Sequence, residues 1–328
     1  MSDVEINPCP APPPAPQFAA ATQPTYVRTL FLGPDGLRPG WGFVFYAVIF
    51  YALQRLAVEL AWARDLGAGG LWSSMLEEFG DLVAALIPAL VLARMERRSW
   101  AAYGIPLKHA FGRLFWTGVL WGSVAISLLM LSLYRLHAFA FGHLALHGWR
   151  ILRFAAFWAL MFLLVGLFEE FLLRGYLQFT LARGTGFWPA AVVLSVVFGL
   201  GHLRNEGEHW SGILAAMFIG LFFCLTLRRT GNLWFAVGFH AAWDWGETFF
   251  YSIPDSGMQA RGHLLNSSWR GPDWLSGGSV GPEGSVLCFL VIALVGVVFG
   301  RTYRAVVRSS GLFALSKTAD SSSPPSSE

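Results

Sequence analysis

Three ionisable residues that could do chemistry lie in one of the most apolar stretches of the chain. Glu169, Glu170 and Arg174 closely follow the apolar run 157–167. A charge at bilayer depth costs about 2.5 to 3.5 kcal/mol on insertion scales, so it usually has a partner and a function. On a helix Glu170 and Arg174 share a face and pair, whereas Glu169 points about 100° away. The spacing therefore predicts that one acid is neutralised while its neighbour faces something else.

Two histidine motifs follow on later apolar segments. Phe198 and His202 are four residues apart, and so are His240 and Asp244. A lone histidine on an apolar helix is more often structural than catalytic. Two in separate segments, with a glutamate pair in a third, need polar partners in a medium without water, and the nearest partners are each other. We expect Glu169, His202, His240 and Asp244 to line one polar cavity between helices.

That set of side chains supports two mechanisms. In the first, Glu169 is a general base that takes a proton from a water also held by His202, and His240 donates to the developing oxyanion. In the second, His202 and His240 with Glu169 or Asp244 bind a metal ion, most plausibly Zn²⁺. The sequence has no His-Glu-x-x-His helix, so such ligands would come from different spans. We favour the mechanism without a metal or other cofactor and keep Zn²⁺ as the alternative.

The composition indicates a polytopic membrane protein. Of 328 residues, 55% are hydrophobic and only 13% are charged, against about 25% charged in a soluble domain. The net charge of +3 gives no indication of a nucleic-acid partner. The three cysteines have neither metal-ligand spacing nor a disulfide pattern.

The predicted fold is all-α: a bundle of about eight transmembrane helices with a polar active-site cavity between the C-terminal helices. A bilayer core needs about 20 apolar residues per helix. The candidate spans are residues 41–62, 79–93, 114–136, 154–181, 187–203, 211–227, 232–250 and 286–301. The fourth is long enough to place Glu169 well inside the bilayer. Glu247, near the end of the seventh, is expected at a solvated rim.

Basic residues cluster in alternate connections, after the second and sixth spans and in the C-terminal tail. The connection after the first span is acidic instead, with Glu77, Glu78 and Asp81. The positive-inside rule then places both termini in the cytoplasm. No cleavable signal peptide is visible. These features predict a multi-pass protein, most simply of a bacterial inner membrane.

The chain divides into three parts by composition. Residues 1–35 read as a disordered Pro/Ala-rich tail, residues 36–305 as the transmembrane domain, and residues 306–328 as a disordered C-terminal tail. The Gly/Ser/Trp-containing segment 251–284 is too polar to span a membrane. We expect it to form a loop or a re-entrant cap over a site.

The ordered motifs resemble those of the CPBP intramembrane proteases, also called the Abi family, which includes the type II CAAX prenyl endopeptidases. The resemblance covers about residues 150–300, the expected protease core. It is carried by three motifs in consecutive apolar segments: Glu169-Glu170-x-x-x-Arg174, Phe198-x-x-x-His202 and His240-x-x-x-Asp244.

The resemblance implies roles for these residues. Glu169 and His202 would activate water, and His240 with residue 244 would stabilise the oxyanion, while Glu170, Arg174 and Phe198 would support them. Residue 244 is Asp where the prenyl endopeptidase branch carries Asn, and an ionised Asp cannot donate a hydrogen bond. Asp244 is therefore protonated, or orients His240, or is a metal ligand.

The predicted function is that of an intramembrane endopeptidase. Its partners would be the lipid bilayer and a membrane-associated or lipidated peptide substrate, including the prenylated CAAX type. The alternative is a non-catalytic membrane scaffold or a bacteriocin self-immunity protein of the same fold. A proton-coupled transporter is a weaker alternative, because no internal repeat is visible.

Overall fold

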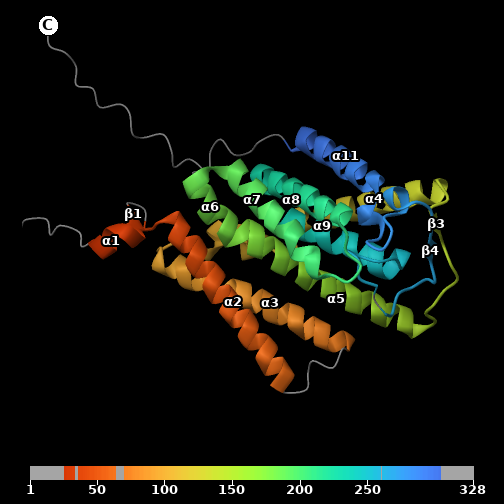
Figure 1. Ribbon diagram of the computed structural model, residues 1–328, viewed down its shortest axis with the longest axis horizontal. Coiled ribbons are helices and arrows are strands. Elements are labelled where there is room, and N and C mark those ends of the chain that lie inside the picture. Colours follow the sequence, from red (N-terminus) through yellow and green to blue (C-terminus); the bar gives the residue numbers. More distant parts are fainter. Residues whose placement is uncertain (1–25, 34–35, 64–69, 260, 304–328) are drawn as a thin grey trace, which may run out of the picture.

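The fold of this protein is built almost entirely from helices. The computed structural model describes residues 26–33, 36–63, 70–259 and 261–303 (Figure 1). In these ranges the only strands form two short antiparallel pairs, β1 (Leu32–Gly33) with β2 (Gly36–Leu37), and β3 (Phe139–Ala140) with β4 (Ser268–Trp269). The prediction of an all-α chain is therefore confirmed as a predominantly helical fold.

The long helices overlap all eight predicted spans. They are α2 (Pro39–Ala63), α3 (Leu71–Met95), α4 (Arg113–Arg135), α5 (Trp149–Leu172), α7 (Phe187–Gly201), α8 (Trp210–Thr230), α9 (Trp234–Trp245) and α11 (Val286–Thr302). Among the described residues, five segments are long and apolar enough to cross a membrane: Pro39–Leu60, Arg113–Arg135, Trp149–Thr185, Phe187–Arg204 and Trp210–Thr230. The chain is thus an integral membrane protein, whereas the count of eight spans stays a prediction.

Helix α3 begins earlier than its predicted span at 79–93. It starts at Leu71, so the acidic residues expected in a connection lie on a helix instead. Within the bundle, Gln54 of α2 donates to Asp81 at 3.3 Å, and Glu78 lines a pocket. Because α3 begins at Leu71, Glu78 lies on this helix and faces the pocket described below.

Close packing of α4 on α9 fixes the position of the second histidine motif. A side chain at Gly118 or Gly122 of α4 would collide with the carbonyl oxygens of Phe235 and Phe239 in α9. Only glycine allows the two backbones to approach this closely. As a result α9 is buried over almost its whole length, and His240 is held beside this contact.

The fourth predicted span breaks where α5 ends. A π-helical turn, η3 (Leu173–Leu177), joins α5 to α6 (Gln178–Thr185). Gly175 leaves helical geometry there, with φ −81° and ψ −122°. π-bulges of this kind are frequent at functional sites, and this one contains Arg174.

Glu96, just beyond the end of α3, ties that end of the helix to the rest of the bundle. Its carboxylate accepts hydrogen bonds from Tyr103 at 3.1 Å, from Tyr176 at 3.1 Å and from Arg183 at 3.1 Å. Tyr103 lies in η1 (Trp100–Tyr103), Tyr176 in η3 and Arg183 in α6. With its side chain only 2% exposed, Glu96 is a buried junction of three segments.

The segment predicted as a loop or cap folds against the bundle. After η5 (Gly246–Tyr251) it contains β4, α10 (Asp273–Ser276) and η6 (Pro282–Gly284), and β4 pairs with β3 in the connection between α4 and α5. Asp255, Ser256, Met258 and Glu283 of this segment line a pocket. It therefore forms one wall of the site.

The remaining short elements are α1 (Tyr26–Phe31), η2 (Leu107–His109) and η4 (His202–Arg204). Helix α1 and the β1–β2 pair lie at the boundary predicted for the N-terminal tail, so ordered structure begins before residue 35. The predicted tails at 1–25 and 306–328 lie outside the described residues.

Candidate active site

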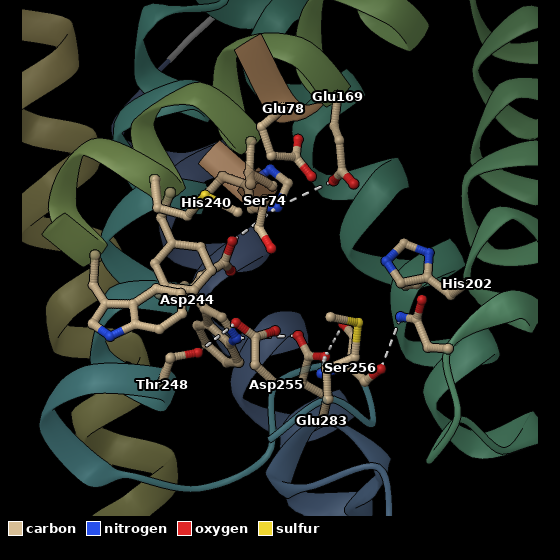
Figure 2. Close-up of a pocket in the computed structure, with 18 of the residues that line it drawn as sticks. Ser74, Glu78, Glu169, His202, His240, Asp244, Thr248, Asp255, Ser256 and Glu283 are labelled. Atoms are coloured by element: carbon tan, nitrogen blue, oxygen red, sulfur yellow. Dashed lines mark hydrogen bonds and ion pairs between the residues drawn. The ribbon is translucent and has the colours of Figure 1, made fainter. Parts of the chain in front are cut away.

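A pocket of about 360 Å³ lies where α3, α5, α7, α9 and the segment 251–285 meet (Figure 2). It receives five carboxylates and two imidazoles but no lysine or arginine. The titratable residues that line it are Glu78, Glu169, His202, His240, Asp244, Asp255 and Glu283. All four residues predicted to be catalytic are therefore in one pocket.

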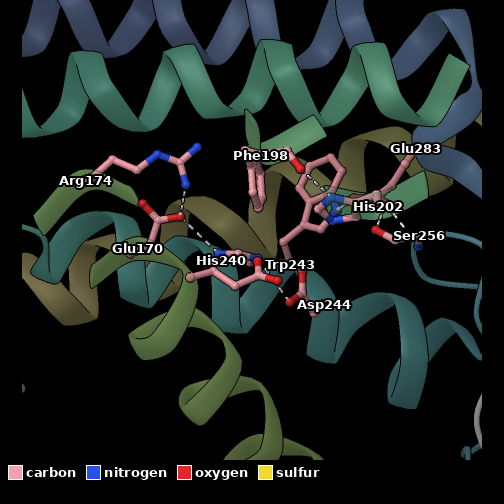
Figure 3. Close-up of polar contacts among 10 residues, drawn as sticks. Glu170, Arg174, Phe198, His202, His240, Trp243, Asp244, Ser256 and Glu283 are labelled. Atoms are coloured by element: carbon pink, nitrogen blue, oxygen red, sulfur yellow. Dashed lines mark hydrogen bonds and ion pairs between the residues drawn. The ribbon is translucent and has the colours of Figure 1, made fainter. Parts of the chain in front are cut away.

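Behind the pocket lies the ion pair predicted from the four-residue spacing. Arg174 Nη1 donates to Glu170 Oε1 at 3.0 Å, and both side chains are fully buried (Figure 3). The guanidinium also lies over the Phe198 ring, with Cζ 4.4 Å from the ring centroid. Cation–π attraction of this kind strengthens when the partners are desolvated. Phe198 thus holds Arg174 in place.

Glu169 has the opposite environment to its neighbour. Its side chain is 25% exposed and faces the pocket, with Oε2 3.5 Å from His240 Nε2. No described residue provides Glu169 with a lysine or arginine partner. The two adjacent glutamates are thus divided as the helix geometry predicts, one paired and one available to solvent or substrate.

His240 is surrounded by carboxylates. Its Nδ1 lies 3.2 Å from Glu170 Oε1, and its Nε2 lies 3.4 Å from Asp244 Oδ2 and 3.5 Å from Glu169 Oε2. The Phe223 ring stacks on the imidazole at 5.5 Å. Because a carboxylate oxygen can only accept, this arrangement favours a proton on both ring nitrogens. His240 is thereby prepared to act as a hydrogen-bond donor.

His202 is held in one tautomer by its own helix. Its Nδ1 lies 2.9 Å from the Phe198 carbonyl oxygen, which can only accept, so Nδ1 carries the proton. In the neutral ring Nε2 is then an acceptor. Figure 2 shows His202 across the pocket from His240 and Glu169. Glu169, His202, His240 and Asp244 line the same pocket. Among the described residues, however, His202 makes no hydrogen bond or ion pair with the other three.

The four predicted residues do not fit a zinc ion as they stand. Among the described residues, no three of them place one ligand atom each within 4.8 Å of one another. His240 Nε2 is approached by two carboxylates, but His202 lies apart from them. The mechanism without a metal remains a prediction.

Sequence reasoning missed several acidic residues at the site. Glu247, expected at a solvated rim, is fully buried, and neither carboxylate oxygen has a hydrogen-bond partner among the described residues. It lies beside Asp255 and Glu283. One sequence feature could have indicated the position of Glu247. It follows Asp244 by three residues, so both side chains lie on one face of the helix. The long loop gave no such signal, because its contacts are set by the tertiary fold.

Asp255 and Glu283 are held by hydrogen bonds. Thr248 Oγ1 donates to Asp255 Oδ2 at 3.1 Å, and Ser256 Oγ donates to Glu283 Oε2 at 2.6 Å. Burial raises the pKa of Asp255 well above its ordinary value, and the negative charges of Asp244 and Glu283 raise it further. This end of the pocket concentrates negative charge.

A comparison with known protein families gives a match over residues 149–246, which include every predicted catalytic residue. This segment matches the family model described as Type II CAAX prenyl endopeptidase Rce1-like. No curated protein and no solved structure matches the chain. The match confirms the resemblance that the three motifs indicate. Residues 149–246, from the start of α5 to the end of α9, are therefore an Rce1-like domain of the type II CAAX prenyl endopeptidase family.

Proposed function

We propose that this protein is an intramembrane endopeptidase that hydrolyses a peptide bond in a membrane-associated, lipidated substrate. The observation that carries the proposal is the pocket itself. Within an Rce1-like domain, a carboxylate without a lysine or arginine partner among the described residues (Glu169), an imidazole with an accepting nitrogen (His202) and a donating imidazole (His240) face one space. These are the groups that activation of water and stabilisation of an oxyanion require.

In the proposed reaction, a water molecule lies between Glu169 and Nε2 of His202. Glu169 takes a proton from this water while the water oxygen attacks the carbonyl carbon of the scissile bond. The carbonyl oxygen becomes an oxyanion and accepts a hydrogen bond from His240. When the C–N bond breaks, Glu169 returns the proton to the leaving amine. The products are a new carboxyl terminus and a new amino terminus.

Asp244 and Glu170 act through His240. Both lie within 3.4 Å of its ring nitrogens, on opposite sides of the imidazole. An ionised Asp244 cannot donate to an oxyanion, but it can orient His240 and favour its protonated form. Of the three roles open to Asp244, we propose this one.

A second cavity suggests where a lipid chain binds. It has a volume of about 810 Å³ and lies between α3 and α5. Its lining is apolar apart from Arg153: Leu71, Trp72, Met75, Trp149, Leu152, Phe154, Ala156, Phe157 and Leu160. Leu71 and Phe157 also line the active-site pocket, so the two cavities adjoin. We propose that this groove takes the prenyl chain of a CAAX-type substrate.

We propose that both termini lie in the cytoplasm, because the basic connections follow the positive-inside rule, and that the membrane is a bacterial inner membrane. The bilayer then surrounds the helices, and a lipidated substrate reaches the groove between α3 and α5 from within the bilayer.

The first test is to express wild type and Glu169→Gln in the host lacking the gene. New protein termini in the membrane fraction are then compared by mass spectrometry. We expect termini that form with wild type and disappear with Glu169→Gln. Glu59→Gln is the control, because Glu59 is exposed and pairs only with Arg55. Identical termini from all three proteins at equal expression would contradict the proposal and favour the non-catalytic scaffold.

A further inference from the structure

We infer that Glu247, Asp255 and Glu283 together bind one hard divalent cation, Ca²⁺ or Mg²⁺, beside the active-site pocket. One carboxylate oxygen from each of the three residues lies within 4.8 Å of the other two. The residues come from η5, from the loop after it and from η6. This set shares no residue with the proposed catalytic groups.

The strongest observation is the state of Glu247. Its side chain is completely buried, and neither of its oxygens has a hydrogen-bond partner among the described residues. The nearby indole N–H of Trp243 donates its single proton to Glu283 Oε1 at 3.2 Å (Figure 3). Leaving a buried polar group unsatisfied is unfavourable, and more so if the group is charged. A bound cation would give Glu247 the partner that it lacks, through at least one of its oxygens.

Little positive charge faces the three carboxylates. Among the described residues, no lysine or arginine lines the adjoining pocket; of its two histidines, His240 is surrounded by other carboxylates and His202 lies across the pocket. Three carboxylates held together in a medium of low dielectric repel one another strongly. A divalent ion removes two of the three negative charges at once.

The donor atoms indicate the kind of ion. All are carboxylate oxygens, with no sulfur or imidazole, which suits Ca²⁺ or Mg²⁺ and disfavours zinc. Two oxygens bound to one Ca²⁺ are at most about 4.8 Å apart, twice the usual Ca–O distance of about 2.4 Å. One oxygen from each of the three residues lies within this Ca²⁺ limit, whereas Mg²⁺, at about 2.1 Å from each ligand, would need the oxygens within about 4.2 Å of one another.

The site has access to water and fixed ligands. Asp255 and Glu283 line the pocket, and Figure 2 shows them beside each other at one end of it. Hydrogen bonds from Thr248 to Asp255 and from Ser256 to Glu283 already orient these two carboxylates. The bound ion would fasten the segment 251–285 to the end of α9.

The test measures binding directly, so it does not depend on proteolysis. The full chain in detergent is stripped with EDTA and dialysed separately against Ca²⁺, Mg²⁺ or Zn²⁺, and bound metal is counted by mass spectrometry. Thermal unfolding is followed in parallel. We expect one Ca²⁺ or Mg²⁺ per chain and a raised melting temperature, with the tighter of the two ions identifying the physiological one.

Glu247→Gln and Asp255→Asn preserve shape and should each weaken binding about tenfold or more, because each removes an anionic ligand. Glu59→Gln is the control, since Glu59 is exposed, pairs with Arg55 and lies outside the group, and it should bind like wild type. Wild type that takes up neither Ca²⁺ nor Mg²⁺ would overturn the inference. So would uptake of zinc alone, or undiminished binding by a folded Glu247→Gln/Asp255→Asn double variant. Metal uptake by the wild-type protein tests the inference without any variant, so misfolding of a variant would not prevent a decision.

Discussion

At the scale of single residues, two adjacent glutamates have opposite tasks. Glu170 is buried against Arg174 and His240, while Glu169 faces the pocket. The same residue type serves as a fixed support in one position and as a candidate base in the next, because a rotation of about 100° separates them on the helix.

The buried pair gives the first prediction. Glu170→Gln leaves the Arg174 charge uncompensated, and we expect it to destabilise the fold by about 3 kcal/mol. Unfolding in detergent measures the change. Glu59→Gln, in an exposed pair, should change stability by less than about 0.5 kcal/mol. The double variant Glu170→Gln/Arg174→Met should recover part of the loss, and a double variant less stable than Glu170→Gln alone would argue against this account.

Asp255 gives a prediction about pH. Burial and the neighbouring Asp244 and Glu283 raise its pKa, so the folded state keeps a proton that the unfolded chain has lost. In EDTA, the free energy of unfolding should therefore fall as pH rises from about 4 toward the raised pKa, by up to about 1.4 kcal/mol per pH unit. Asp255→Asn should flatten this slope in thermal melts across pH. An equal slope in the variant would assign the proton to another group.

The spacing of residues predicted part of this site. Four-residue intervals predicted that Glu170 would meet Arg174 and that Asp244 would meet His240, and both contacts are present. Such intervals describe one helix only. The approach of Asp255 to Glu283 depends on how a long loop folds, and no local pattern encodes it.

At the scale of elements, the contact between α4 and α9 positions the site. Gly118 and Gly122 allow the two backbones to touch, and His240 directly follows Phe239, which lies against Gly122. The sequence predicted both helices but not the contact between them. A glycine in an apolar span can mark a close helix contact, a kink or no special feature, so its presence alone does not identify a partner helix. The burial of Glu247 was missed for a related reason: a position near a helix end was taken to be near water.

Gly122→Ala tests the role of this contact. The added methyl group would collide with the Phe239 backbone, so we expect a loss of about 1 to 3 kcal/mol in stability and reduced proteolysis. Gly300→Ala in α11 is the control, since a Cβ there meets nothing within 4 Å. Unfolding and cleavage assays on both variants provide the comparison. Equal behaviour of the two would mean that α4 and α9 can separate without cost.

At the scale of the whole molecule, the active-site pocket opens toward the groove between α3 and α5, where the proposed lipid chain would lie. Figure 1 shows α2 and α3 together on one side of the bundle, next to α5. The family match begins at residue 149 and does not include α3, so one wall of the groove comes from outside the matched segment. Features that select a substrate can therefore differ from the family in this part of the chain.

Filling the groove tests the substrate class. Ala156→Trp places an indole in the groove, and we expect it to raise KM for a prenylated peptide about tenfold or more, with little change for a peptide without the lipid. Ala159→Trp, exposed on the same helix and outside both cavities, is the matched control. Steady-state kinetics in proteoliposomes give both constants. An equal effect on both peptides would show that the groove does not hold the lipid.

The buried junction at Glu96 has a mechanical consequence. It anchors one end of α3, and Leu71, at the other end, borders the groove. A helix from Leu71 to Met95 is about 36 Å long, so a tilt of about 5° pivoting on Glu96 would move Leu71 by about 3 Å. Contacts at Glu96 that resist such a tilt would therefore also limit changes in the width of the groove at Leu71, at the far end of the same helix.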